Sequence, residues 1–185
     1  MRHIIYNMTH GSRALIFLAC IACLCSACTD EVNKAFSTKY PVRFFFETAQ
    51  SPDLYNTMNG MGIFLSIRQS NGKIRIITPE GRYTDFNPSA IGATDYRYGL
   101  GGLIVGVTYT GDPVAYDLSC PTCDRQSHRL TVSGDGYATC EKCGTRYDLN
   151  NYGTIFSTLE PKPDNLRPLY RYRIIYNGVS INVFN

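Results

Sequence analysis

The stretch CPTCDRQSHRLTVSGDGYATCEKCG, residues 120–144, contains two CxxC pairs, Cys120 with Cys123 and Cys140 with Cys143. Two residues between cysteines allow one turn to direct both sulfur atoms at a single ion, and two such pairs supply four tetrahedral ligands. Sixteen residues separate the pairs, a spacing typical of zinc sites. Gly144, directly after the last cysteine, fits the tight turn of such a metal knuckle. The sequence therefore predicts one metal site formed by these four cysteines.

Three occupants fit this quartet. Structural zinc, which needs four thiolates and no redox partner, is the expected one. An all-cysteine [2Fe-2S] cluster of low potential has the same ligands and is the alternative. Without a metal, the four cysteines would be thiols or disulfides in an oxidising compartment.

The N-terminal residues 1–27 have the layout of an export signal. Basic Arg2 and Arg13 precede an apolar run over 14–25, which is too short to remain as a membrane-spanning helix. Ser26 and Ala27 precede Cys28, as in a bacterial lipobox, although Cys25 stands where leucine is usual. We expect lipidation of Cys28, a tether over 28–39 and a membrane-anchored lipoprotein of the cell envelope, on the periplasmic face or the cell surface. Cleavage near Ala27 to give an ordinary secreted protein is the alternative.

Charge and cysteine usage limit the function further. The formal net charge of +3 does not support a basic surface for nucleic acid. Four of the eight cysteines belong to the signal and its cleavage point, so the quartet holds all the others. His128 is the only histidine of the expected mature chain and is predicted to be an exposed loop residue. We therefore expect no catalytic residues and a protein that is not an enzyme unless the site holds iron and sulfide.

The pattern along the chain is mostly β. Asn71-Gly72 and Asn177-Gly178 are hairpin signals between apolar runs. Residues 52–58 form the best short helix candidate, 78–99 read as loops, and the glycines of YGLGG (98–102) are expected to permit a bulge or a close backbone approach. The expected strands are 40–46, 62–68, 73–78, 103–109, 114–118, 169–176 and 179–184. Short strands at turn-rich spacing predict an all-β antiparallel sandwich or barrel.

The residues around the second CxxC pair resemble those of a Rieske domain. The segments CEKCGTRYDLNNYG (140–153) and LRPLYRYRIIYNGVSINVF (166–184) are similar to the second half of that family, and GGLIVGVTYTGDPVAYDLSCP (101–121) to its first ligand hairpin. The resemblance covers about residues 100–185 and implies a Rieske-like sandwich over 40–185 with a two-hairpin, zinc-ribbon-like tip at about 118–148. The matching positions are Cys140, Cys143, Gly144, Tyr147, Asp148, Gly153, Pro161, Leu169 and Tyr172.

The ligands depart from that family. A Rieske centre has two cysteines on one iron and two histidines on the other. Here cysteines occupy both histidine positions, and a single mature histidine cannot replace them. We therefore expect a Rieske-shaped, non-catalytic module or accessory subunit with an unknown protein partner, and an electron-transfer protein if the quartet holds iron and sulfide.

Overall fold

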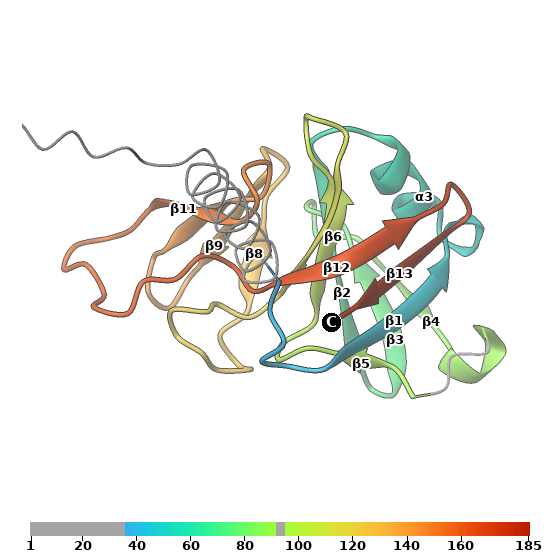
Figure 1. Cartoon of the computed structure of the whole chain (residues 1–185). Helices are drawn as coiled ribbons and strands as arrows, with labels where there is room; N and C mark the ends of the chain where they lie inside the picture. The colour runs from blue at the N-terminus through green and yellow to red at the C-terminus, as the bar shows by residue number, and fades with distance from the viewer. Residues whose placement is uncertain (1–35, 92–94) are drawn as a thin grey trace, which may run out of the picture. The chain divides into compact units, whose positions relative to one another are not determined.

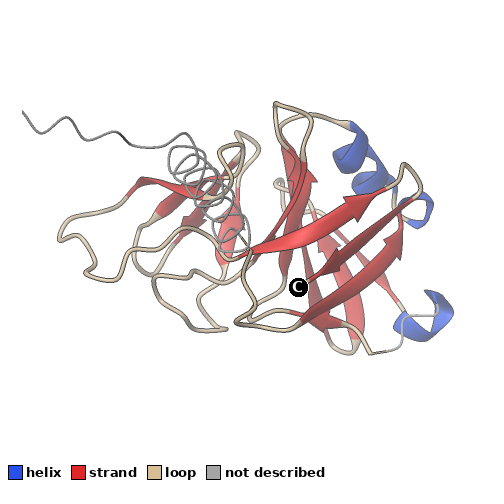
Figure 2. Cartoon of the chain, viewed as in Figure 1, coloured by secondary structure: helices blue, strands red, loops and turns tan. Residues whose placement is uncertain are grey.

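The computed structural model describes residues 36–91 and 95–185, which contain thirteen strands, one α-helix and two 3-10 turns (Figures 1 and 2). The expected signal, Cys28 and most of the expected tether lie outside the described residues. The expectation of an all-β antiparallel fold is confirmed. The strands are β1 Val42–Glu47, β2 Ile63–Ser70, β3 Lys73–Ile77, β4 Tyr83–Phe86, β5 Arg97–Tyr98, β6 Leu103–Val107, β7 Pro113–Asp117, β8 Leu130–Val132, β9 Tyr137–Cys140, β10 Arg146–Asp148, β11 Thr154–Ser157, β12 Arg171–Tyr176 and β13 Ser180–Phe184.

Nine strands form one antiparallel sheet in the order β4-β3-β2-β6-β7-β12-β13-β1-β5. The sheet curls on itself (Figure 1). Phe46 of β1 packs against Phe86 of β4, near the other end of the strand order, with ring centroids 5.1 Å apart. Alternate residues of β1, including Phe44 and Phe46, are buried in the core enclosed by this curl, whereas Phe45 between them is exposed. This alternation is the period of a strand with one face on a core.

Both predicted hairpins are present. Ser70 pairs with Lys73, so Asn71 and Gly72 are the two loop residues between β2 and β3, both with positive φ, as a type I′ turn requires. At the second hairpin the loop is shifted by one residue from the prediction. The Asn177 N–H bonds the Ser180 carbonyl, which leaves Gly178 and Val179 as the loop, with positive φ at Gly178 as in a type II′ turn.

The predicted short helix is α3, Pro52–Asn59. Ser51 is its N-cap, because its hydroxyl oxygen accepts the Leu54 N–H at 3.3 Å, and Pro52 occupies the first turn. Leu54 and Met58, four residues apart, are buried in the core of the large sheet. Within the described part of the chain, no helix has the length and apolar character needed to cross a membrane.

The prediction of loops over 78–99 was wrong in part. Strands β4 and β5 form the two edges of the large sheet, and residues Pro88–Ile91 form a 3-10 turn. Strand β5 is only two residues long, and β4 contains Thr84 and Asp85, so neither has the apolar alternation by which strands are recognised.

A second, four-stranded sheet has the order β11-β10-β9-β8, and its strand β9 ends at Cys140. Its strands are three or four residues long, and none is among the expected strands, although the Rieske resemblance implied two hairpins at about 118–148. Strand β8 also contacts β2 of the large sheet. A separate apolar cluster, which includes Tyr116, Leu130, Tyr147 and Leu169, joins the two sheets.

Candidate metal centre

The fold brings the predicted quartet together. Cys120 follows β7 and Cys140 ends β9, and the four sulfur atoms all lie within 4.8 Å of one another. The Sγ atoms of Cys120 and Cys143 are 3.6 Å apart, and those of Cys123 and Cys140 are 3.8 Å apart. All four are free thiols, since a disulfide requires about 2.05 Å between its sulfur atoms. A single ion can therefore contact four sulfur atoms in this position.

Each CxxC pair forms the same turn. The Asp124 N–H donates to the Cys120 carbonyl and the Gly144 N–H donates to the Cys140 carbonyl, both at 2.8 Å. The residue after the second cysteine has positive φ in both turns, 52° at Asp124 and 68° at Gly144. Sequence reasoning identified the second turn from its glycine and missed the role of Asp124, although aspartate is one of the few residues that adopts this conformation readily.

A third segment, the loop between β11 and β12, contacts both turns. The Asn165 side chain donates to the carbonyl of Thr122 in the first pair at 2.9 Å. Leu159 packs on the second turn so closely that a Cβ added to Gly144 would lie 2.3 Å from its Cδ1. Three loops therefore enclose the centre. The spacing of the cysteines indicates the first two loops but not the third.

Two hydroxyl groups lie against the sulfur atoms. The Tyr147 hydroxyl is 3.4 Å from Cys120 Sγ and 3.0 Å from Thr122 Oγ1, and all three side chains are buried. Thr145 Oγ1 is 3.2 Å from Cys143 Sγ. Hydrogen bonds of this kind stabilise a thiolate and influence the properties of a bound metal.

Burial and hydrogen bonds act differently on the individual thiols. Burial raises the pKa of Cys123, and it raises that of Cys140 to about 11. At Cys143 burial acts in the same direction, but hydrogen bonds with Thr145, Cys140 and Cys120 together outweigh it and lower the pKa to about 7. Without a bound cation the site therefore favours one thiolate over four, because additional negative charges would be buried close together.

Asp124 connects the first turn to the N-terminal end of the described chain. Its carboxylate forms an ion pair with Lys39 and accepts the hydroxyl groups of Tyr40 and Tyr170 at 2.7 and 2.9 Å. The hydrogen bond from Lys39, and to a smaller extent those from the two tyrosines, lower the pKa of Asp124 to about 2. The first cysteine turn is thus fixed to the segment that the sequence predicts as the end of the tether.

The segment 98–102 makes the predicted close backbone approach. The Leu100 and Gly101 N–H groups donate to the buried carboxylate of Asp117, at 2.6 and 3.1 Å. A Cβ on Gly101 would lie 2.0 Å from Ser119 Oγ, so the chain could not pass here with a larger residue. Asp117 also accepts the Ser119 N–H and the Tyr172 hydroxyl, both at 2.7 Å. Sequence reasoning did not single out this carboxylate, which supports the strand leading to Cys120.

His128 lies in the loop between Cys123 and β8 and is half-buried, not exposed as predicted. It contributes no atom to the group of clustered sulfur ligands. Its carbonyl accepts the Cys120 N–H at 2.9 Å, so its contribution to the site is through the backbone. Asp148, near the second pair, accepts the Asn150 and Asn151 N–H groups, a turn-forming role.

The chain matches no protein-family model, no curated protein and no solved structure. The residues and their geometry are therefore the basis for a proposal of function.

Proposed function

We propose that Cys120, Cys123, Cys140 and Cys143 hold one structural zinc ion. The observation that carries the proposal is the mutual distance of the four sulfur atoms, none above 4.8 Å. Zinc–sulfur bonds of about 2.3 Å place the corners of a regular tetrahedron about 3.8 Å apart. Two of the pairs, at 3.6 and 3.8 Å, match that edge.

The surroundings suit a structural ion. Cys120 and Cys140 are fully buried, and all four positions are supplied by protein, which leaves none for a substrate or water. The bound cation would hold the two cysteine turns together against the repulsion of their thiolates and add its binding free energy to that of folding.

We place this centre in a non-catalytic, Rieske-like module of the cell envelope, anchored through lipidated Cys28 and serving an unknown protein partner. The arrangement of the loops supports this: the first cysteine turn connects β7 to β8, the second connects β9 to β10, and a third loop bonds the first turn. The lipobox-like residues Ser26, Ala27 and Cys28 support the anchor.

Electron transfer through an all-cysteine [2Fe-2S] cluster is the second candidate. The hydroxyl groups of Tyr147 and Thr145 beside Cys120 and Cys143 favour it, because hydrogen bonds to sulfur tune the potential of such clusters. The short sulfur distances favour a single ion, since two bridged irons hold their terminal thiolates in two separate pairs.

The test is metal analysis of the full chain, purified without oxygen, by mass spectrometry together with its visible spectrum. One zinc per chain and no colour is the expected result. Two irons with acid-labile sulfide would establish the electron-transfer alternative, one iron would establish a mononuclear iron site, and a metal-free protein would refute both metal proposals.

Two single-cysteine variants provide the control. Cys140→Ser should lose the metal and lower the melting temperature, whereas Cys28→Ser, outside the quartet, should keep the metal. Cys28→Ser should also move the protein from the membrane to the soluble fraction and remove the lipid mass from the intact chain. If Cys28→Ser differs from wild type only by the mass of the substitution itself and stays with the membrane, the lipid anchor is refuted without affecting the metal proposal.

A further inference from the structure

A hollow of about 230 Å³ lies between the two sheets, where β2 and β3 face β8. Ser66 and Arg68 of β2 line one side, and Arg129 and Thr131 line the other. Its lining includes two arginines and no aspartate or glutamate among the described residues. The hollow therefore has a concentrated positive charge with no negative group in its wall.

Both arginines lack an acidic partner. The Nε atom of Arg68 is buried without a hydrogen bond, and neither Arg68 nor Arg129 forms an ion pair with any residue in the described ranges. Burial, and then the charge of Arg68, lower the pKa of Arg129, so the two guanidinium groups repel each other. The charge of Asp117 acts in the opposite direction and raises the pKa of Arg129, but it does not outweigh burial and the charge of Arg68.

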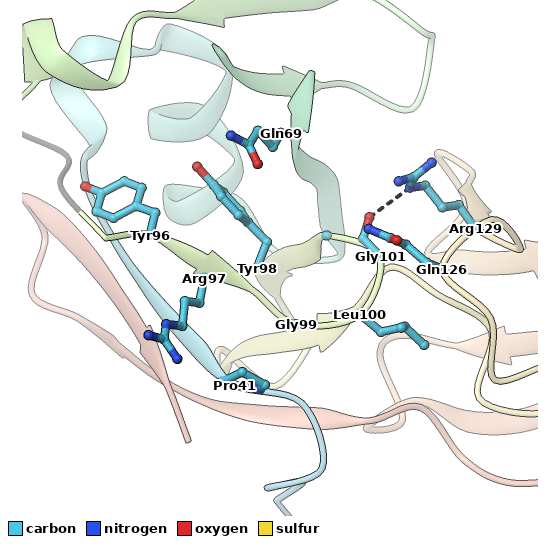
Figure 3. A pocket seen from close by; sticks show the side chains of 11 residues that line it. Pro41, Gln69, Tyr96, Arg97, Tyr98, Gly99, Leu100, Gly101, Gln126 and Arg129 are labelled. Atoms are coloured by element: carbon cyan, nitrogen blue, oxygen red, sulfur yellow. Dashed lines mark hydrogen bonds between the residues drawn. The ribbon is translucent and has the colours of Figure 1, made fainter. Parts of the chain in front are cut away.

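The backbone fixes the two arginines. Arg129 Nε donates to the Gly101 carbonyl at 2.9 Å, the bond drawn as a dashed line in Figure 3. Arg68 lies beside Gly102, the residue after Gly101. A Cβ added to Gly102 would lie 3.1 Å from the Arg68 Cβ. Arg129 also borders the neighbouring hollow of about 300 Å³ shown in Figure 3, which likewise has no carboxylate in its described lining.

We propose that the hollow between β2, β3 and β8 is a binding site for a doubly charged oxyanion, a phosphate group, held by Arg68 and Arg129. Two guanidinium groups match the charge of a phosphate dianion and donate in the planar geometry that phosphate accepts. The hydroxyl group of Ser66 lines the same hollow and provides a further donor, whereas the Thr131 hydroxyl already donates to Glu141 Oε1 at 3.1 Å. Its volume is below the range typical of drug-sized ligands, which fits a small anion.

This site is distinct from the cysteine centre and does not depend on which metal that centre holds. A bound anion would neutralise two repelling cations between the sheets and stabilise the contact of the cysteine-bearing sheet with the large one. The phosphate group can come from free inorganic phosphate or from a phosphate monoester.

The test is isothermal titration of the full chain with inorganic phosphate and, separately, with glycerol phosphate, at constant ionic strength maintained with sodium chloride. We expect one anion per chain and a rise in melting temperature that chloride does not produce. Tighter binding of inorganic phosphate identifies the free ion as the ligand, and tighter binding of glycerol phosphate identifies a monoester. No saturable binding of either probe would overturn the proposal.

Variants separate this site from general charge effects. Arg68→Gln and Arg129→Gln should each weaken binding by about tenfold or more, the loss of one charge-assisted hydrogen bond. Arg97→Gln is the matched control, because Arg97 lines the neighbouring hollow and is paired with Asp95. Arg68→Lys keeps the positive charge and should bind phosphate with intermediate affinity. This variant still tests the site if the glutamine variants do not fold. Equal weakening by Arg97→Gln and Arg68→Gln would overturn the proposal.

Discussion

The Tyr147 hydroxyl lies 3.4 Å from the Sγ atom of Cys120, and both groups are buried between the two sheets. Strand β10 supplies the tyrosine, and the chain after β7 supplies the cysteine, so this contact joins the two halves of the site. Burial and the neighbouring thiol raise the pKa of Tyr147 and keep it protonated as a donor.

Tyr147→Phe should therefore weaken metal binding. The substitution removes the donor to Cys120 and leaves the ring in place, and the loss of such an outer hydrogen bond costs about 10- to 100-fold in metal affinity. Competition with a chelator measures this affinity directly.

Tyr116→Phe is the control for that experiment. Its hydroxyl is also buried but donates to the Leu149 carbonyl at 2.9 Å, not to sulfur. In the metal-free protein both variants should lose about 1 kcal/mol of stability, the net value of a hydrogen bond. Only Tyr147→Phe should release metal more readily, and equal affinities would contradict a role of this hydroxyl at the metal.

Gly144→Ala should destabilise the second cysteine turn. Gly144 has a φ of 68°, which costs a residue with a Cβ about 1–2 kcal/mol, and the new Cβ would also meet Leu159. Gly111→Ala separates the two effects, because Gly111 has a φ of 87° with open space around it. Urea unfolding should show a larger loss for Gly144→Ala. Equal losses of stability in the two variants would show that Leu159 moves away from the new Cβ with no loss of stability.

The sequence predicted those parts of the fold that depend on local patterns. The hairpin at Asn71-Gly72 was recognisable because both residues tolerate positive φ. The helix expected over 52–58 is present, and in the structure a serine cap and a proline in the first turn mark its start. The quartet was recognisable because its chemistry depends on short spacing within each pair. At the second hairpin the turn shifted by one residue, because Gly178 adopts the first loop position and Asn177 pairs with Ser180.

What the sequence did not predict depends on contacts distant along the chain. The short strands of the small sheet, such as Arg146–Asp148, are stabilised by their neighbours on both sides and carry no apolar repeat. The sequence did not indicate the role of Asp117, because this carboxylate accepts hydrogen bonds from residues 100, 101 and 172, which are distant from it along the chain. The Arg68–Arg129 hollow likewise exists only where the two sheets meet.

Phe46→Ala should strongly destabilise the large sheet. Phe46 is 1% exposed and packs against Phe86 across the curl, and removal of a buried phenylalanine costs about 3–5 kcal/mol. Phe45→Ala, on the other face of the same strand where the ring is 46% exposed, should change stability by about 1 kcal/mol or less. Unfolding in urea measures both. Similar losses for the two variants would contradict the described register of β1.

The Arg75–Asp85 pair predicts a pH-dependent difference in stability. Both carboxylate oxygens of Asp85 accept from the Arg75 guanidinium at 2.7 Å, and this pair lowers the pKa of Asp85. A carboxyl group whose pKa is lowered by folding stabilises the protein above its unfolded pKa of about 4 and loses that contribution as pH falls further. The stability gap between wild type and Asp85→Asn should therefore be largest at neutral pH and shrink below about pH 4.

Asp95→Asn is the control for this pair. The arginine partners of Asp95 lie at 3.5 and 3.7 Å on the surface, so the stability gap between wild type and Asp95→Asn should be smaller. Urea unfolding across this pH range tests the pair, and a gap at Asp85 that does not change with pH would show that the ion pair contributes nothing.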